Sequence, residues 1–382
     1  MRHLHDLWHR VPPSLRFRLR DQAAQLAEHG RRARLWRWNA STFASPRGVH
    51  GHVAYLGRRE ATHSAEEAFG DQESNGGLTS SLNGISVSEL PVPGALKVPH
   101  TLRMMIDCHG TLDQIVRRGS HGAWRHVLPA VGACSIAPVT DDIEIARISE
   151  QLLEPYAAAR HGEEAVQVPL GTVRSLAQHG GLCALYYRGK ELAVRLSYEY
   201  EHDGIRTFAA WRFGFPPHVY EDRGRYALAN GLNTYFSIRH AVESGFTMMD
   251  FGLSPSHPFD NGPMKFKRMH AAAVSAVNIH EFFYVRTPAS QRAWFLWVRP
   301  LFSVERGQVV LNAGVPAELG DAELIARVKS EMVIRGVSRV RLHSERKLPW
   351  RVLEQVRAAF TLGKRAAPSD RTPVIEVAPV WE

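Results

Sequence analysis

Hydrophobic and polar positions follow two different periods along the middle of the chain. Residues 142–160 repeat apolar side chains at every third or fourth position, which predicts a helix that Thr140 or Asp141 caps. Three later runs are rich in β-branched and aromatic residues and end near glycine, so we expect strands at residues 182–189, 191–204 and 205–214. This part of the chain therefore predicts a helix followed by a meander of strands.

Similar patterns continue on both sides of these elements. They predict strands at residues 101–107, 135–140 and 247–252, helices at 111–128 and 168–181, a loop and helix at 221–246, and a strand–helix–strand–helix series at 307–363. This order indicates an α+β fold with mixed, mostly antiparallel sheets flanked by helices.

The length of 382 residues exceeds one ordinary hydrophobic core, so we expect more than one domain. The expected organisation is a basic N-terminal segment at 1–60 leading into a first lobe, a flexible loop at 61–84, the first lobe at 85–140, a second lobe at 141–285, a C-terminal βαβα unit at 286–363 and an extended tail at 364–382. Residues 14–37 predict a basic helix, which is either a surface helix or a peripheral contact with an acidic membrane.

Composition narrows the class of protein. Hydrophobic residues make up 44% and charged residues 22%, as in globular proteins, and no apolar run reaches about 18 residues, so we expect no transmembrane helix. The N-terminus lacks the apolar stretch of a signal peptide, which predicts a cytoplasmic protein. Three widely spaced cysteines and the absence of metal-ligand spacing such as HExxH predict reduced thiols and no metal site. The net charge of +9 favours anionic partners.

One segment, residues 249–272, combines groups that a packed core does not need. Asp250 is followed by an aromatic residue and Gly252, then by a turn cluster and a basic run. The alternation of Lys265, Phe266 and Lys267 predicts a strand with both ammonium groups on one face. Two such groups suit a phosphate or pyrophosphate, although a solvated strand edge would show the same pattern.

The ordered motifs resemble those of the FemAB-like branch of the GNAT acyltransferase superfamily, including the BioF2-like type. The resemblance rests on the helix start at residues 228–231, on Gly245, on the Asp-Phe-Gly of residues 250–252 and on residues 262–267, and it covers roughly residues 102–276. The chain differs where that branch usually has Arg-Ser after Asp-Phe-Gly and Trp-Gly after the lysine segment. The resemblance implies tandem GNAT-like domains that transfer an acyl group.

The resemblance and the residue types together suggest roles for individual side chains. As catalytic residues we expect Asp250, as a general base or a hydrogen-bonding strand end, and Tyr235, as a phenolic donor or a core tyrosine. The expected substrate-binding residues are Lys265, Lys267, Arg239, Gly252, Trp211 and Arg212, with pairing to Asp250 as the alternative for Arg239. The loop before the crossover helix, with Arg223, Gly224 and Arg225, is expected to bind the donor cofactor.

The leading hypothesis is an acyltransferase that uses a CoA-type donor and acylates an amine or hydroxyl of a saccharide or amino compound, in envelope or exopolysaccharide metabolism. No tightly bound cofactor is expected, and the acceptor is expected to be a phosphorylated small molecule or a saccharide. Two alternatives stay open at this point: a FemAB-like aminoacyltransferase that uses aminoacyl-tRNA as donor, and a catalytically degenerate GNAT-like binding or scaffold protein. Nucleic-acid binding on charge alone is a weaker reading.

Overall fold

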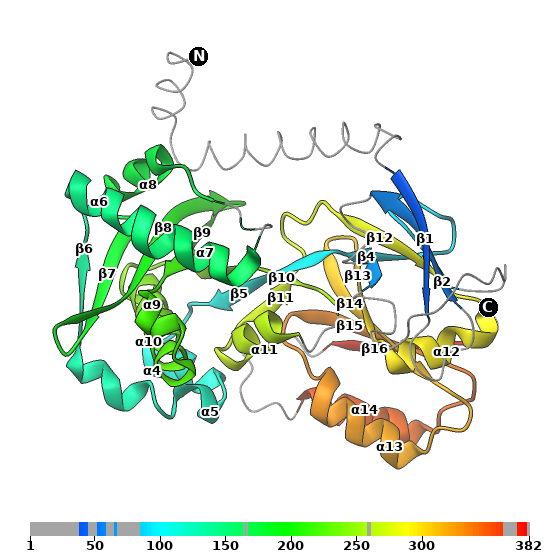
Figure 1. Ribbon diagram of the computed structural model, residues 1–382. Helices are drawn as coiled ribbons and strands as arrows, with labels where there is room; N and C mark the ends of the chain where they lie inside the picture. The colour runs from blue at the N-terminus through cyan, green and yellow to red at the C-terminus, as the bar shows by residue number, and fades with distance from the viewer. Residues whose placement is uncertain are drawn as a thin grey trace. The chain divides into compact units, whose positions relative to one another are not determined.

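The computed structural model describes residues 38–44, 52–58, 65–66, 85–162, 165, 167–257, 261–361 and 373–379. The chain forms two compact units (Figure 1). Among the described residues, the first contains those of 105–252 and 269–272, and the second contains those before residue 105, those of 253–268 and those from residue 273 onward. The domain boundaries expected from the sequence stay a prediction, and the basic helix at 14–37 lies outside the described residues, as does the loop at 61–84 apart from 65–66.

A seven-stranded sheet, most of which belongs to the first unit, runs in the order β11-β5-β10-β9-β8-β7-β6. Its strands are β5 (Thr101–Asp107), β6 (Cys134–Pro138), β7 (Leu182–Tyr187), β8 (Lys190–His202), β9 (Ile205–Gly214), β10 (Met248–Pro255) and β11 (Ala273–Ser275). The neighbours from β6 to β9 pair antiparallel, whereas β10 pairs parallel to β9. The meander expected from the sequence is confirmed, and both β5 and β10 continue into the second unit.

Helices pack on both faces of this sheet. They are α4 (Leu112–Arg118), α5 (His121–Trp124), the 3-10 helix η3 (Leu128–Ala133), α6 (Asp142–Ile148), the π-helical turn η4 (Ser149–Leu153), α7 (Glu154–His161), α8 (Leu170–Ala177), α9 (Pro217–Tyr220) and α10 (Arg223–Glu243). One face carries α6, η4 and α8, whose apolar side chains form a core with those of β7 and β8. The other face carries α10, where Asn233 donates from its amide to the Val194 carbonyl of β8.

Local capping explains where these helices begin and end. The helix expected at 142–160 is confirmed as the continuous series α6, η4 and α7, and Asp141 caps it by accepting from the Glu144 N–H. The single helix expected at 111–128 is wrong. Gly119 interrupts it in an extended conformation, and Ser120 caps a second helix, α5, by accepting from the Ala123 N–H.

The second unit contains two further sheets. One has the order β1-β2-β3-β12-β4 and the other the order β13-β14-β15-β16. The strands are β1 (Trp38–Ala44), β2 (His52–Arg58), β3 (Ile85–Ser88), β4 (Leu96–Pro99), β12 (Phe282–Arg286), β13 (Leu301–Glu305), β14 (Gln308–Val315), β15 (Val337–Ser344) and β16 (Val374–Pro379). The tail expected to be extended thus contributes β16, which pairs parallel to β15.

The helices of the second unit are α11 (Gly262–Met269), α12 (Ala289–Val298), α13 (Asp321–Arg327), the π-helical turn η6 (Val328–Met332) and α14 (Trp350–Thr361). Helix α12 lies directly on β14, because a Cβ added at Gly314 would come within 1.7 Å of the Ala293 carbonyl oxygen. The strand–helix–strand–helix series expected in this part is confirmed by β14, α13, β15 and α14. Together the two units confirm the α+β class with mixed sheets flanked by helices.

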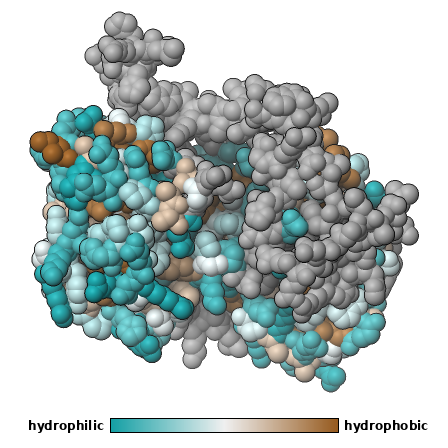
Figure 2. Space-filling model, in the orientation of Figure 1, coloured by the Kyte–Doolittle hydropathy of each residue, from teal (hydrophilic) through white to brown (hydrophobic). Residues whose placement is uncertain are grey.

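The described part of the chain holds no helix that is both long and apolar enough to span a membrane. The surface drawn over the helices of the first unit is mainly hydrophilic with scattered hydrophobic spots (Figure 2). Cys108, Cys134 and Cys183 are free thiols.

Candidate active site

Strands β9 and β10 pair over a short stretch only. Their parallel register runs from Met248–Thr207 to Asp250–Ala209, while β9 continues to Gly214. Beyond the last pair, the rings of Phe213 and Phe251 lie 6.4 Å apart between centroids. We call this unpaired stretch, residues 210–214 of β9 and residues 251–252 of β10, the β9–β10 split. Gly252 stands at its edge with a φ of +79°, a left-handed conformation that favours glycine.

A β-bulge lies in β9 at the start of the split. In the register with β8, Ser197 pairs with Ala210 and Leu196 pairs with Arg212, which leaves Trp211 as an extra residue. Bulges break the regular ladder and redirect the side chains beside them, and they are common next to active sites. The sequence-predicted residue Trp211 therefore marks the point where β9 is distorted.

The two predicted residues at this bulge interact with each other and with the core. Trp211 packs against the core of α6, η4 and α8, and its ring meets that of Tyr198 edge-on at 5.7 Å. The Arg212 guanidinium lies 5.6 Å from the centroid of the Trp211 ring. Arg212 is half-buried, and this burial lowers its pKa.

Asp250 lies at the end of the β9–β10 register and is 2% exposed. Its Oδ2 accepts from the Tyr200 hydroxyl at 3.1 Å, and its Oδ1 accepts from the Gly252 N–H at 2.8 Å. Tyr200 stands on β8, two strands away. Sequence reasoning missed it because the partner lies 50 positions from Asp250 along the chain. The pair gives the site a buried carboxylate and a phenol in direct hydrogen bond.

The predicted residues of α10 lie elsewhere on the first unit. Tyr235 is half-buried, and its ring meets that of Trp124 edge-on at 6.3 Å. Arg239 is exposed and forms an ion pair with Glu243 at 2.7 Å. The alternative in which Arg239 pairs with Asp250 is therefore wrong. The Arg239 guanidinium binds the Glu243 carboxylate, which lies four residues further along the same helix.

The first turn of α10 contains Arg223, Gly224 and Arg225, which the sequence places at the donor. Asp222 caps this turn, since its Oδ1 accepts from the N–H groups of Gly224 at 2.8 Å and Arg225 at 2.9 Å. Hydrogen bonds from the Arg225 and Gly224 backbone lower the pKa of the Asp222 carboxyl. The helix N-terminus thus holds an acceptor from its own chain, while the Arg223 and Arg225 side chains are exposed.

Aromatic side chains cluster beside this turn. Tyr156 of α7 shares a hydrogen bond of 2.7 Å with the hydroxyl of Tyr226 on α10, and Phe215 packs edge-on against both rings. The Arg160 guanidinium lies 5.8 Å from the centroid of the Tyr226 ring. Burial raises the pKa of Tyr156. Sequence reasoning missed this cluster, because its members come from three separate segments.

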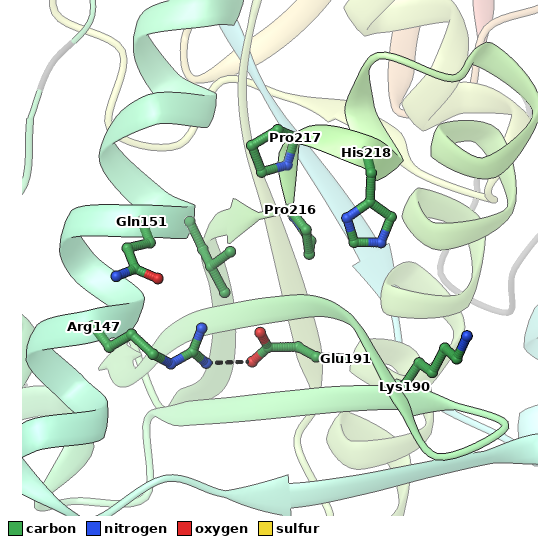
Figure 3. Close-up of a pocket in the computed structure, with 8 residues that line it drawn as sticks. Arg147, Gln151, Lys190, Glu191, Pro216, Pro217 and His218 are labelled. Atoms are coloured by element: carbon green, nitrogen blue, oxygen red, sulfur yellow. Dashed lines mark hydrogen bonds and ion pairs between the residues drawn. The ribbon is translucent and has the colours of Figure 1, made fainter.

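A cavity of about 550 Å³ opens at the carboxyl end of β9 (Figure 3). It is lined by Arg147, Gln151, Leu152, Lys190, Glu191, Pro216, Pro217 and His218. Arg147 lies between two carboxylates, with Nη2 at 2.6 Å from Glu144 and 2.7 Å from Glu191. The hydrogen bonds to Glu144, and to a smaller extent those to Glu191, raise the pKa of Arg147. The sequence predicted none of the lining residues.

Lys265 and Lys267 do not lie on a strand, so this expectation is wrong. They belong to helix α11, which Asn261 starts by accepting from the Met264 N–H at 2.9 Å. Two positions along a helix point about 200° apart, so the two ammonium groups do not share a face. Lys267 donates from Nζ to the Leu253 carbonyl at 2.7 Å, and Lys265 is exposed.

Within the described residues no group of His, Cys, Asp or Glu could hold a metal ion. The first unit therefore assembles Trp211, Arg212, Asp250 and Gly252 at one place, together with Tyr200. The residues of α10 form separate groups, and the two lysines belong to the second unit.

Comparison with known proteins gives a result only at the level of structure. No family model matches the chain, and no curated protein matches it. Among solved structures, FemX is 12% identical with a TM-score of 0.38, and the match covers 68% of this chain and 90% of FemX. The chain is similar to FemX.

Two acetyltransferase structures are also similar. A GCN5-related N-acetyltransferase from Sphaerobacter thermophilus is 10% identical with a TM-score of 0.31, over 65% of this chain and 75% of that one. A tandem GNAT protein from the clavulanic acid biosynthesis pathway is 16% identical with a TM-score of 0.28, over 53% and 64% respectively.

Proposed function

We propose that the chain is an acyltransferase that moves an acyl group from a CoA-type donor to an amine or hydroxyl of a saccharide or amino compound, in envelope or exopolysaccharide metabolism. The observation that carries the proposal is the β9–β10 split, where a three-pair parallel register ends beside the bulge at Trp211. An extended donor arm with amide groups can bind to strands that are not paired with each other through main-chain hydrogen bonds.

The transfer itself needs few protein groups. The nitrogen or oxygen of the acceptor forms a bond to the acyl carbon, and the carbon–sulfur bond of the thioester breaks. The acceptor loses a proton, and the sulfur departs as a thiolate that takes up a proton to give the free thiol. Backbone donors at a bulge suit the developing oxyanion. The buried pair Asp250–Tyr200 stands at the last paired position and can receive or hold a proton there.

Charge supports a donor with phosphate groups. The chain carries a net charge of +9, and the start of α10 presents the exposed side chains of Arg223 and Arg225. Because Asp222 already accepts from the first N–H groups of α10, we assign the phosphates to the arginine side chains and not to the helix backbone.

Two alternatives keep specific support. Aminoacyl-tRNA is an ester donor that, like a CoA thioester, contains phosphate groups and an adenosine, so Arg223 and Arg225 suit it as well. A binding or scaffold role without catalysis is favoured by the Asp222 cap, which places a carboxylate where a donor phosphate would otherwise accept hydrogen bonds.

Thermal unfolding of the full chain distinguishes these functions, because a ligand that binds only the folded state raises its stability. We expect acetyl-CoA to raise the melting temperature and Arg223→Ala with Arg225→Ala to reduce the shift. Arg351→Ala, an exposed arginine of α14, serves as the matched control. A shift with aminoacylated tRNA but not with uncharged tRNA or acetyl-CoA selects the second donor, and no shift with any of them contradicts transfer.

A further inference from the structure

The cavity at the end of β9 presents hydrogen-bonding groups that the described residues leave unused. Arg147 binds its two carboxylates through Nε and Nη2, so Nη1 is available. Glu191 accepts through Oε1 alone, which leaves Oε2. Figure 3 shows these two side chains side by side at one edge of the cavity, with Gln151 next to Arg147 on the same helix series. A donor and an acceptor therefore stand together.

The charges around the cavity balance. Arg147 and Lys190 carry two positive charges, and Glu191 with Glu144 carries two negative ones. An anionic ligand gains little from a guanidinium that already binds two carboxylates, and a simple cation meets the neighbouring lysine. The lining favours a ligand that is neutral, or nearly so, and that both donates and accepts hydrogen bonds.

The rest of the wall is apolar. Leu152, Pro216 and Pro217 present carbon surface, and the cavity of about 550 Å³ falls in the range of small-molecule sites, roughly 300–1,000 Å³. A ring compound with hydroxyl groups at its rim and C–H groups on its faces matches this mixture. Such a compound is a hexose or an N-acetylated hexosamine.

The cavity is tied to the proposed reaction site through the backbone. Pro216 and Pro217 follow Gly214, the last residue of β9, by two and three residues. The backbone of Leu152 packs on the same glycine, where an added Cβ would lie 3.0 Å from the Leu152 carbonyl carbon and oxygen. The walls of the cavity are therefore connected to, and packed against, the strand that borders the β9–β10 split.

We propose that this cavity binds a saccharide and is the acceptor site of the chain. The role as acceptor site rests on the proposed transferase function, whereas the binding of a sugar ring rests on the cavity alone. Glu191, Arg147 and Gln151 hold the hydroxyl groups, and Pro216 and Pro217 contact a face of the ring.

Saturation-transfer NMR on the full chain tests this site with methyl β-D-glucopyranoside, N-acetylglucosamine and glucose 6-phosphate as probes. We expect the first two to bind, and Glu191→Ala and Gln151→Ala each to weaken binding at least fivefold. The matched controls are Glu199→Ala, an exposed carboxylate on the same strand β8, and Gln178→Ala, an exposed glutamine after α8. Glu191→Ala leaves Arg147 paired with Glu144, so the variant keeps a partner for the guanidinium.

Three results would overturn the inference: no binding of either neutral sugar, binding that the cavity variants leave unchanged, or a tenfold preference for glucose 6-phosphate. Thermal shifts with acetyl-CoA on the same samples separate the two proposals. A donor shift without sugar binding refutes the saccharide site and keeps the transferase, whereas sugar binding at the cavity without any donor shift supports the site and counts against transfer.

Discussion

Arg195 of β8 and Cys183 of β7 are cross-strand partners, and the guanidinium Nη2 lies 3.8 Å from the cysteine sulfur. Arg195 is 2% exposed, donates from Nη1 to the Ser237 hydroxyl and lies 5.1 Å from the centroid of the Phe208 ring. Its partners among the described residues are thus a thiol, a hydroxyl and an aromatic ring. Burial is the main cause of the lowered pKa of Arg195.

This burial leads to a prediction about stability. A buried charge without a carboxylate partner keeps most of its desolvation cost, so an apolar side chain of similar length is tolerated. We expect Arg195→Met to leave the free energy of unfolding unchanged or to raise it by about 1 kcal/mol, measured by urea denaturation. Arg195→Ala should lower it by about 2–5 kcal/mol, since it opens a cavity. A loss above about 2 kcal/mol in the methionine variant would contradict the argument.

The pair Asp250–Tyr200 gives a prediction that separates structure from chemistry. Tyr200→Phe removes one buried hydrogen bond, so we expect a loss of about 1–2 kcal/mol in unfolding free energy. Asp250→Asn should lower acyl transfer about 100-fold or more if the carboxylate acts on a proton. Tyr187→Phe on β7 is the control and should stay within about 0.5 kcal/mol. Full activity in the asparagine variant would assign Asp250 to folding alone.

Much of the first unit was predictable from the sequence, because apolar stripes and terminal glycines mark its helices and strands. The strand expected at residues 265–267 failed for a physical reason. Lys-Phe-Lys alternates as a strand does, but the Asn261 cap and the buried Met264 fix a helix. The cavity was beyond prediction, since Arg147, Glu191 and Pro216 meet only through tertiary contacts between distant segments.

The two lysines of α11 should now behave differently. Lys267 holds the Leu253 carbonyl, so we expect Lys267→Ala to lower the unfolding free energy by about 1 kcal/mol. Lys265 is exposed, and Lys265→Ala should change it by less than about 0.5 kcal/mol. Denaturation of both variants beside an activity assay checks this. If Lys267→Ala lost activity under conditions where it is still folded, Lys267 would have a ligand-binding role after all.

Buried histidines in the second unit predict sensitivity to acid. Burial, with a smaller effect of Arg292 and Arg341, lowers the pKa of His343 to about 4, and burial lowers that of His257 to about 3. The unfolded chain takes up these protons below about pH 6.5, whereas the folded chain does not. Stability is therefore present above pH 6.5 and is lost as the pH falls toward 4, by on the order of 3 kcal/mol for His343.

Urea midpoints between pH 7.5 and 4.5 measure this loss. His343→Asn should be less stable at pH 7, because it disturbs the hydrogen bond to Asn312, but its stability should vary less with pH. His121→Asn, at an exposed position of α5, should keep the full dependence. Equal slopes in all three proteins would rule out His343 as a source.

Close packing of α12 on β14 gives a last prediction. An added methyl group at Gly314 would overlap the Ala293 carbonyl at 1.7 Å, and backbone cannot move aside as a side chain can. We expect Gly314→Ala to lower the unfolding free energy by about 3 kcal/mol or more. Gly132→Ala, where nothing lies within 4 Å, is the control. Comparable stability of the two variants would show that α12 can shift.

The extra residue at Trp211 has a consequence for anyone who aligns or redesigns β9. A strand places successive residues on opposite sides, so one additional residue inverts that alternation for everything after it. An ungapped alignment with an unbulged strand would assign Arg212 and Phe213 to the wrong sides. Deletion of Trp211 alone would interchange those sides and would turn the half-buried Arg212 guanidinium away from its present neighbours.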